Sequence, residues 1–333
     1  MLRGRRLGHL ATAAPVLTGL VLVAALVTGA VWSSEQATVP TGRGAEGSSA
    51  AAAPGGRSSA ASATRTVADS APATLPGGRT RVFADNRFLV AYYGTAGSGA
   101  LGVLGEGTPE RMQRRLTRAA APFARPGRPV QPVYELIVTI ADAHPGKDGD
   151  YNHDISRRQV RSYIDAAHRH DALVVLDVQP GKARFDSVVR RWAWALRDPW
   201  VGLALDPEWR MARGGVPGRR VGTVGAAEVD RVSAMLSRLV ARHRLPQKLF
   251  LLHQFRRDMV VHPERVVARP GLAMVQHVDG FGTRQQKLAT YRNVARPRQF
   301  TMGFKLFYDE DVHRMGAAAV GKVRPRVRFV SFQ

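Results

Sequence analysis

Two carboxylates, Asp206 and Glu208, stand two residues apart at the end of a predicted strand. Side chains alternate along a strand, so both should share one face with the small residues Gly202 and Ala204, while leucines take the other face. Two residues of strand span about 6.6 Å, and the carboxyl groups of glycosidase pairs lie about 5–5.5 Å apart when retaining or about 6.5–9.5 Å apart when inverting. The spacing predicts a carboxylate pair for glycoside cleavage, with Glu208 as general acid, and does not choose between the two outcomes.

A third carboxylate, Asp177, ends the preceding strand and is predicted beside Asp206, about 4.8 Å away between backbones. Such a row of like charges is unfavourable unless a proton, a cation or a substrate relieves it. Lys305 is the predicted counter-charge, with an ordinary salt bridge at the rim as the competing interpretation. Trp209 offers an apolar wall that would raise the pKa of Glu208, and a flat face for a sugar ring. The alternative is that the Asp-Pro-Glu run only caps a loop or pairs with nearby arginines.

Polar residues also end other predicted strands, where the carboxyl ends of parallel strands would face one pocket. The predicted catalytic residues are Glu208, Asp206 and Asp177. The predicted substrate-binding residues are Tyr92, Trp209, Gln179, His253, Gln254, His277, Asp279 and Lys305. Among these, Tyr92, Gln254 and Lys305 are expected to position a sugar.

Metal binding is a competing interpretation for a few of these residues. His253, His277 and Asp142 could converge on zinc or another divalent ion, but their mixed positions along the strands give no common face. Acidic residues in the 142–154 segment are spaced as in a calcium loop, yet His153 replaces the turn glycine and Gln159 replaces the bidentate glutamate. We therefore predict no metal site and no cofactor.

Strand-like and helical patterns alternate after residue 81, which is typical of βα units on a parallel sheet. The predicted strands are 88–93, 133–141, 173–178, 201–206, 248–254, 273–278, 301–307 and 327–332. The predicted helices are 109–121, 156–170, 184–196, 226–243 and 284–294. These elements predict a (β/α)8 TIM-like barrel closed by the last strand, with a doubly wound open sheet as the alternative.

Three glycines after the first predicted strand, Gly97, Gly99 and Gly102, superficially match a dinucleotide-binding fingerprint. They do not open a helix, because the helical pattern begins only near Thr108, and no acidic residue ends a second strand at the required distance. We predict a flexible loop over the barrel mouth in place of a nucleotide site.

An uncharged apolar span at residues 10–32 follows Arg3, Arg5 and Arg6, which is the layout of an exported chain. The span is long enough to cross a bilayer, so we expect a single-pass anchor with its N-terminus inside the cell; a cleaved signal peptide is the alternative. Residues 33–80, rich in Ala, Gly, Ser, Thr and Pro, predict a disordered linker before a barrel domain at 81–333. The barrel is therefore expected outside the cell, membrane-anchored or secreted.

Composition narrows the classes of partner. The chain has 333 residues, with 49 Lys and Arg against 26 Asp and Glu, a net charge of +23 and no cysteine. The lack of cysteine excludes a disulfide scaffold, a thiolate zinc site and a cysteine nucleophile. The basic residues are scattered through predicted helices, so we expect a surface that adheres to polyanions and do not expect a nucleic-acid partner. No pattern indicates an oligomeric state.

Several short motifs stand at the predicted strand ends or in the loops that follow them. They are Tyr92-Tyr93-Gly94, Gly102-Val103-Leu104-Gly105-Glu106, Leu176-Asp177-Val178-Gln179-Pro180-Gly181, Leu205-Asp206-Pro207-Glu208-Trp209, His253-Gln254-Phe255 and Phe307-Tyr308-Asp309-Glu310-Asp311. Residues 81–333 with these motifs resemble an uncharacterised family of secreted bacterial TIM-barrel proteins. The Asp-x-Glu of the fourth strand is also similar to that of lysozyme-type and chitinase-type glycoside hydrolase barrels, in which the Glu is the acid and an Asp assists. Val201 and Ala204 stand where the chitinase-type pattern has acidic residues, which argues against substrate-assisted chemistry.

These observations predict an exported, glycoside-hydrolase-like barrel that acts on cell-wall or extracellular polysaccharide through Glu208. A non-catalytic carbohydrate- or wall-binding protein is the second hypothesis. A metal-dependent hydrolase is the third.

Overall fold

The structure is a computed structural model, and it describes residues 72–333. The predicted leader at 1–32 and most of the predicted linker at 33–80 lie outside the described residues. Within residues 72–333, no helix has both the length and the apolar character that crossing a bilayer requires.

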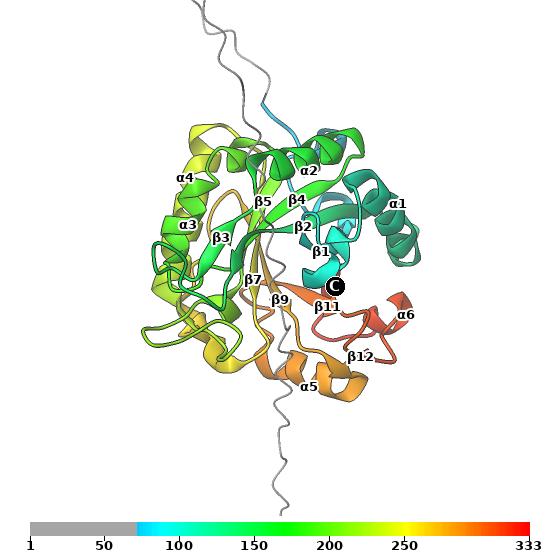
Figure 1. The fold of residues 1–333 in the computed structure, drawn as a ribbon. Helices are drawn as coiled ribbons and strands as arrows, with labels where there is room; N and C mark the ends of the chain where they lie inside the picture. The colour runs from blue at the N-terminus through cyan, green and yellow to red at the C-terminus, as the bar shows by residue number, and fades with distance from the viewer. Residues whose placement is uncertain (1–71) are drawn as a thin grey trace, which may run out of the picture. The chain divides into compact units, whose positions relative to one another are not determined.

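Eight parallel strands close into a barrel (Figure 1). In chain order they are β1 (Phe88–Thr95), β2 (Val130–Ala141), β4 (Leu173–Val178), β5 (Val201–Leu205), β7 (Lys248–His253), β9 (Leu272–Val278), β11 (Thr301–Leu306) and β13 (Val327–Phe332). Strand β1 pairs with both β13 and β2, which closes the ring. The predicted barrel is confirmed, and the open-sheet alternative is wrong.

Short strands join the loops at the carboxyl end of the barrel. β3 (Asn152–Asp154) pairs antiparallel with the end of β2. β6 (Val224–Gly225) pairs with β8 (Val260–Val261), and β10 (Gly282–Thr283) pairs with β12 (Asp311–Val312). The loops that follow β5 and β7 are thereby joined to each other, as are the loops that follow β9 and β11.

Six α-helices lie between the strands and cover the barrel. They are α1 (Pro109–Ala120), α2 (Arg157–Arg169), α3 (Phe185–Arg191), α4 (Ala226–Arg242), α5 (Arg284–Val294) and α6 (Ala317–Val320). Single 3-10 turns lie at Pro76–Gly78, Ala84–Asn86, Gly99–Leu101, Val103–Gly105, Ala121–Phe123, Ala195–Arg197, Pro207–Trp209, Arg257–Met259 and Pro263–Arg265. Capping boxes begin α2 at Ser156 and α5 at Thr283, which fixes both helix starts near the predicted residues.

Helix α3 ends at Arg191, five residues before its predicted end at 196. The next residue, Trp192, is buried, and its indole N–H donates to the Thr139 hydroxyl of β2 at 2.9 Å. This bond holds the indole against the barrel wall where the chain leaves the helix. The spacing of apolar residues predicts a longer helix, because a polar contact to a strand far away in the sequence leaves no trace in that spacing.

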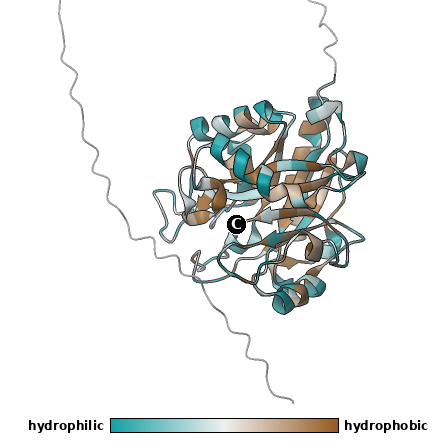
Figure 2. Cartoon of the chain, turned by 90° about the vertical axis from the view of Figure 1, so that its right-hand side faces the viewer, coloured by the Kyte–Doolittle hydropathy of each residue, from teal (hydrophilic) through white to brown (hydrophobic). Residues whose placement is uncertain are grey.

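Alternation along the strands divides the apolar core into two layers. Inside the barrel lie small and branched residues such as Ala204, Leu251 and Val275. Between the strands and the helices lies a larger layer that contains Leu203 and Leu205. The predicted orientation of β5 is therefore confirmed up to its last residue. In Figure 2 the strands are coloured mainly as hydrophobic, and the helices carry both hydrophilic and hydrophobic stretches.

The amino-terminal end of the barrel is closed by the segment that precedes β1. Leu75 and Val82 are buried and belong to the interior layer, and the indole N–H of Trp200 donates to the Thr74 carbonyl at 2.8 Å. Arg79 donates through its guanidinium to Gln131 of β2. The barrel unit therefore begins before Arg81, its predicted start, because residues 74–80 supply a floor that composition alone does not reveal.

Candidate active site

Interior side chains change from apolar to polar toward the carboxyl ends of the barrel strands. Because the strands are parallel, these ends form one rim, where TIM-barrel active sites are built. The buried polar side chains at this end, or just beneath it in the barrel interior, are Tyr93, Glu135, Asp177, Gln179, Asp206, His253, His277, Asp279, Lys305 and Ser331. Together with Glu208 we call this set the mouth, and it is the candidate active site.

Asp206 and Glu208 are joined through a tight turn. Strand β5 ends at Leu205, and the chain then enters the 3-10 turn Pro207–Trp209. The carboxylate of Asp206 accepts a hydrogen bond from the Glu208 backbone N–H at 3.2 Å and so caps this turn. Strand alternation therefore places Asp206 but not Glu208, and the predicted strand spacing does not apply to this pair. Glu208 and Trp209 are both partly buried.

The carboxylates of the mouth lie close enough to perturb one another. Burial, followed by repulsion from Asp206, raises the pKa of Glu208 to about 8. Burial also raises the pKa of Asp177 to about 7 and that of Asp206 to about 6, although His253 opposes both shifts. Near neutral pH, Glu208 therefore holds a proton more often than Asp206 does.

Tyr93 links several groups on one side of the mouth. Its hydroxyl donates to the Asp177 carboxylate at 2.9 Å and accepts from the Gln179 amide at 3.3 Å. The Lys305 ammonium lies 3.5 Å from the centre of the Tyr93 ring. Lys305 makes no ion pair within residues 72–333, so a rim salt bridge does not describe it. Its charge lowers the pKa values of Asp206, Glu208 and Asp279 relative to burial alone.

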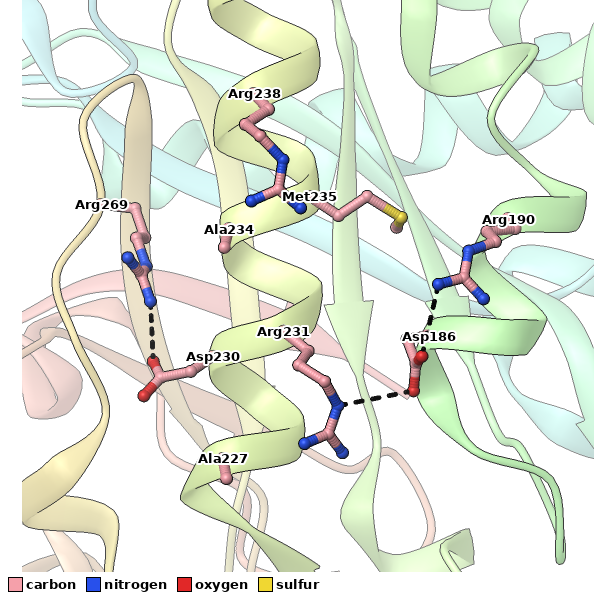
Figure 3. A pocket seen from close by; sticks show the side chains of 9 residues that line it. All are labelled: Asp186, Arg190, Ala227, Asp230, Arg231, Ala234, Met235, Arg238 and Arg269. Carbon is pink, nitrogen blue, oxygen red and sulfur yellow. Dashed lines mark ion pairs between the residues drawn. The ribbon is translucent and has the colours of Figure 1, made fainter.

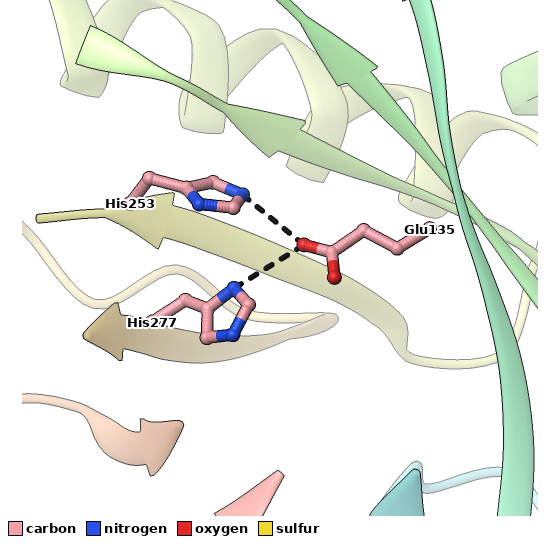
Figure 4. A group of neighbouring side chains, drawn as sticks. All are labelled: Glu135, His253 and His277. Carbon is pink, nitrogen blue, oxygen red and sulfur yellow. Dashed lines mark ion pairs between the residues drawn. The ribbon is translucent and has the colours of Figure 1, made fainter. Parts of the chain in front are cut away.

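Two imidazoles converge on one carboxylate deeper in the barrel (Figure 4). Glu135 Oε1 lies 3.1 Å from His253 Nε2 and 3.2 Å from His277 Nδ1. The far nitrogen of each ring is also engaged: His253 Nδ1 lies 2.9 Å from an Asp279 oxygen, and His277 Nε2 lies 3.0 Å from the Ser331 hydroxyl. Burial opposes ionisation of Glu135, but the two imidazoles outweigh it and lower its pKa below the ordinary value.

Glu135 is a site residue that the sequence analysis missed. It is the one charged residue of β2, and it shares the inward alternation of Val133. A lone carboxylate inside an apolar strand is the signal that could have revealed it. A search limited to strand ends passes over it, because Glu135 lies in the middle of β2.

Two predicted sugar-positioning residues lie outside the barrel. Tyr92 points into the layer beneath the helices, where its hydroxyl lies 3.1 Å from that of Tyr308. Gln254 donates to the Arg256 carbonyl at 2.9 Å and accepts from Gln276 at 2.7 Å. Each is one residue from the inward position, which Tyr93 and His253 occupy. The prediction that Tyr92 and Gln254 line the pocket is therefore wrong, because side chains alternate along each strand.

The combination of His253, His277 and Asp142, considered above only as a competing metal site, does not assemble. Asp142 lies in the loop after β2 and contacts the exposed His153, whose Nδ1 is 2.8 Å from Asp142 Oδ2. In the same segment, Asp154 pairs with Arg191 at 2.9 Å. The segment is thus held by one contact within it and by one ion pair to helix α3.

The glycine-rich segment after β1 packs tightly against the end of the strand. A Cβ on Gly94 would lie 2.7 Å from the Gly102 carbonyl oxygen, and Gly102 has φ of +130°, so both positions require glycine. Leu104 is buried, and its carbonyl accepts from the Tyr163 hydroxyl at 2.9 Å. Helix α1 begins after Thr108, so the glycines do not open it, as expected.

A separate groove lies on the outer surface of the barrel, against α3 and α4 (Figure 3). Its volume is about 670 Å³. The charged residues that line it are Asp186, Arg190, Asp230, Arg231, Arg238 and Arg269. Asp186 lies 3.5 Å from Arg190 and 3.9 Å from Arg231, so part of the positive charge is neutralised locally. The groove contains none of the mouth residues.

Comparisons with known proteins find neither a protein family nor a curated protein that matches this chain. The mouth itself is therefore the basis for assigning a function.

Proposed function

We propose that the chain is a glycoside hydrolase in which Glu208 is the general acid. The observation that carries this proposal is the difference between two adjacent carboxyl groups: the pKa of Glu208 is raised to about 8, and that of Asp206 only to about 6. Glycoside hydrolysis needs one protonated and one ionised carboxyl group at the same bond. Environments that separate two pKa values in this way assign the acid and its partner.

In the proposed reaction, Glu208 donates its proton to the departing glycosidic oxygen as the bond to the anomeric carbon breaks. Asp206 or Asp177, in ionised form, stabilises the positive charge on the sugar or attacks its anomeric carbon. Hydrolysis by water completes the cycle and returns the proton to Glu208. Of the two, Asp206 has the lower pKa, about 6 against about 7 for Asp177, and is the more readily ionised.

Neighbouring side chains orient these groups. The Tyr93 hydroxyl donates to Asp177 and favours its ionised form, while Lys305 supplies positive charge that opposes the crowding of carboxylates. We assign the positioning of the sugar to Tyr93, Gln179 and Lys305. The side chains of Tyr92 and Gln254 lie outside the barrel and do not point into the mouth. Trp209, partly buried in the same turn as Glu208, offers a ring face for stacking.

We propose a polysaccharide of the cell wall or the extracellular space as the substrate. The net charge of +23 favours adhesion to acidic polymers. Export through residues 1–32, by an anchor or a cleaved signal, would bring the barrel to such a substrate. A barrel that binds glycans without cleaving them is the rival proposal.

The test compares the full-length wild type with Glu208→Gln and with the control Glu264→Gln. Glu264 is an exposed glutamate of the 3-10 turn Pro263–Arg265, so its substitution matches the chemistry of the first without touching the mouth. We expect the wild type and Glu264→Gln to release reducing ends from purified bacterial cell walls, and Glu208→Gln to lose at least about 100-fold in rate. Retained binding without release by any of the three proteins would favour the rival proposal.

A further inference from the structure

We propose a binding site for one divalent metal ion, Zn²⁺ or a first-row neighbour of it, inside the barrel. Its ligands are Glu135, His253 and His277. This inference goes beyond the proposed hydrolase function and does not depend on it. Two imidazoles and one carboxylate make a donor set that suits Zn²⁺ and its first-row neighbours. All three side chains are fully buried.

The separations between the donor atoms match a shared ion. Ligands of Zn²⁺ lie about 2.1 Å from the metal, so two of them that subtend 90–109° are about 3.0–3.4 Å apart. Glu135 Oε1 lies 3.1 Å from His253 Nε2 and 3.2 Å from His277 Nδ1. The three donor atoms all lie within 4.8 Å of one another. The two separations that involve Glu135 thus fit one shared ion, and the three residues form a group that could hold a metal ion.

The directions of these contacts also favour an ion over a hydrogen bond. Within residues 72–333, His253 Nε2, His277 Nδ1 and both Glu135 oxygens have no hydrogen-bond partner, although they are buried. Buried polar groups are nearly always satisfied. The carboxylate oxygen thus lies near each nitrogen but off its N–H direction. An ion shared by the two atoms produces this arrangement, because it occupies the nitrogen lone-pair axis and leaves the oxygen about 40° away from it.

The opposite side of each ring is arranged as in known metal sites. Metal-bound histidines usually engage their second nitrogen with a carboxylate, a carbonyl or another polar group, which fixes the ring and its tautomer. Asp279 does this for His253, and the Ser331 hydroxyl does it for His277. Asp206, His253 and Asp279 form a second cluster that could hold a metal. Asp279 already lies at hydrogen-bond distance from His253 Nδ1, 2.9 Å, whereas Glu135 has no hydrogen-bond partner among the described residues, so we assign the ion to Glu135.

The experiment uses full-length protein, stripped with a chelator and titrated with Zn²⁺ by calorimetry, with metal content measured after dialysis. We expect one ion per wild-type chain and a loss of affinity of at least about 100-fold in Glu135→Gln, which preserves shape. Ser331→Ala should cost about 10-fold, as expected for a residue that orients a ligand. The control His262→Asn removes an exposed histidine and should change nothing.

Absence of stoichiometric binding by the wild type would overturn the proposal. Equal affinity in the wild type and Glu135→Gln would also overturn it, since the ion would then be held by other residues. If Glu135→Gln does not fold, X-ray absorption of the Zn²⁺-loaded wild type decides the question. A first shell with two imidazoles and a carboxylate supports the site, and a shell with fewer than two imidazoles contradicts it.

Discussion

The Asp206 carboxylate accepts a hydrogen bond from the backbone N–H of Glu208 at 3.2 Å and at the same time raises the pKa of the Glu208 side chain. The residue that holds the turn in place therefore also adjusts the acidity of the proposed catalytic acid. Asn at position 206 can still cap the turn, because it keeps an acceptor oxygen, but it carries no charge. The two effects of Asp206 can thus be separated.

We predict that Asp206→Asn lowers the pKa of Glu208. Removing the neighbouring charge makes ionisation of Glu208 easier, while its burial keeps the pKa above the ordinary value of 4.5. NMR titration of the Glu208 carboxyl carbon, assigned by comparison with Glu208→Gln, measures this without a substrate. A midpoint lower by about one pH unit is expected, and an unchanged or higher midpoint would show that Asp206 does not repel Glu208.

The raised pKa of Glu208 also predicts how stability depends on pH. A carboxyl group whose pKa is higher in the folded than in the unfolded chain favours folding at low pH, and this contribution is lost as pH rises through the folded-state value. As the pH rises from 4.5 to about 8, the unfolding free energy of the wild type should therefore fall relative to that of Glu208→Gln. After solvent screening we expect about 1–2 kcal/mol.

Urea unfolding at pH 4.5 and pH 8.5 checks this shift. Glu264→Gln is the control, because that exposed carboxyl group does not have a raised pKa. A difference between the wild type and Glu208→Gln that stays constant across this range would mean that the folded state does not favour protonated Glu208.

The two adjacent tyrosines of β1 give a matched pair of variants. Tyr93→Phe removes the hydroxyl that bonds to Asp177 and Gln179, and we expect the kcat of glycan hydrolysis to fall about 10-fold or more, as for a group that positions a catalytic carboxylate. Tyr92→Phe removes a hydroxyl that contacts Tyr308 outside the barrel, and kcat should stay unchanged. Steady-state rates and circular dichroism on both proteins test this. Equal losses in the two variants would contradict the inward orientation of Tyr93.

Gly202 tests the packing beneath the mouth. A Cβ at this position would lie 2.3 Å from the Leu249 carbonyl oxygen of the neighbouring strand, so Gly202→Ala must push two strands apart. We expect a loss of about 1–3 kcal/mol in unfolding free energy, the usual effect of overpacking. Gly316→Ala, where no atom lies within 4 Å of the added carbon, is the control. If Gly202→Ala lowers the unfolding free energy no more than the control does, β5 and β7 lie farther apart than they do in this structure.

The alternation of side chains along strands and the periodicity of apolar residues in helices were enough to predict the barrel fold. Both patterns depend only on residues that are close in the sequence. The apolar runs located all eight strands, and small Ala204 against large Leu203 and Leu205 oriented β5 correctly. The same rule fails at Glu208, because a strand end can turn within two residues. Asp206 followed by proline is such a turn, and its capping bond is visible only in the structure.

Side-chain direction at the strand ends was harder to predict than strand position. Tyr92 and Tyr93 are both aromatic and both buried, so composition does not say which one faces inward. Glu135 is found only when the whole interior of the barrel is considered. Its two imidazole neighbours come from β7 and β9, more than 100 residues later in the chain. Contacts of this kind depend on which side chains meet across the barrel interior, and local patterns do not encode those meetings.

The dependence of hydrolysis on the leaving group tests the role of Glu208 most directly. A general acid is needed for a poor leaving group and not for an activated one, so Glu208→Gln should lose at least about 100-fold in rate on wall polysaccharide. It should keep most of the wild-type rate on 2,4-dinitrophenyl glycosides, tested as a panel of common sugars. Equal losses on both kinds of substrate, or full activity of Glu208→Gln on the polysaccharide, would contradict the assignment of Glu208 as the acid.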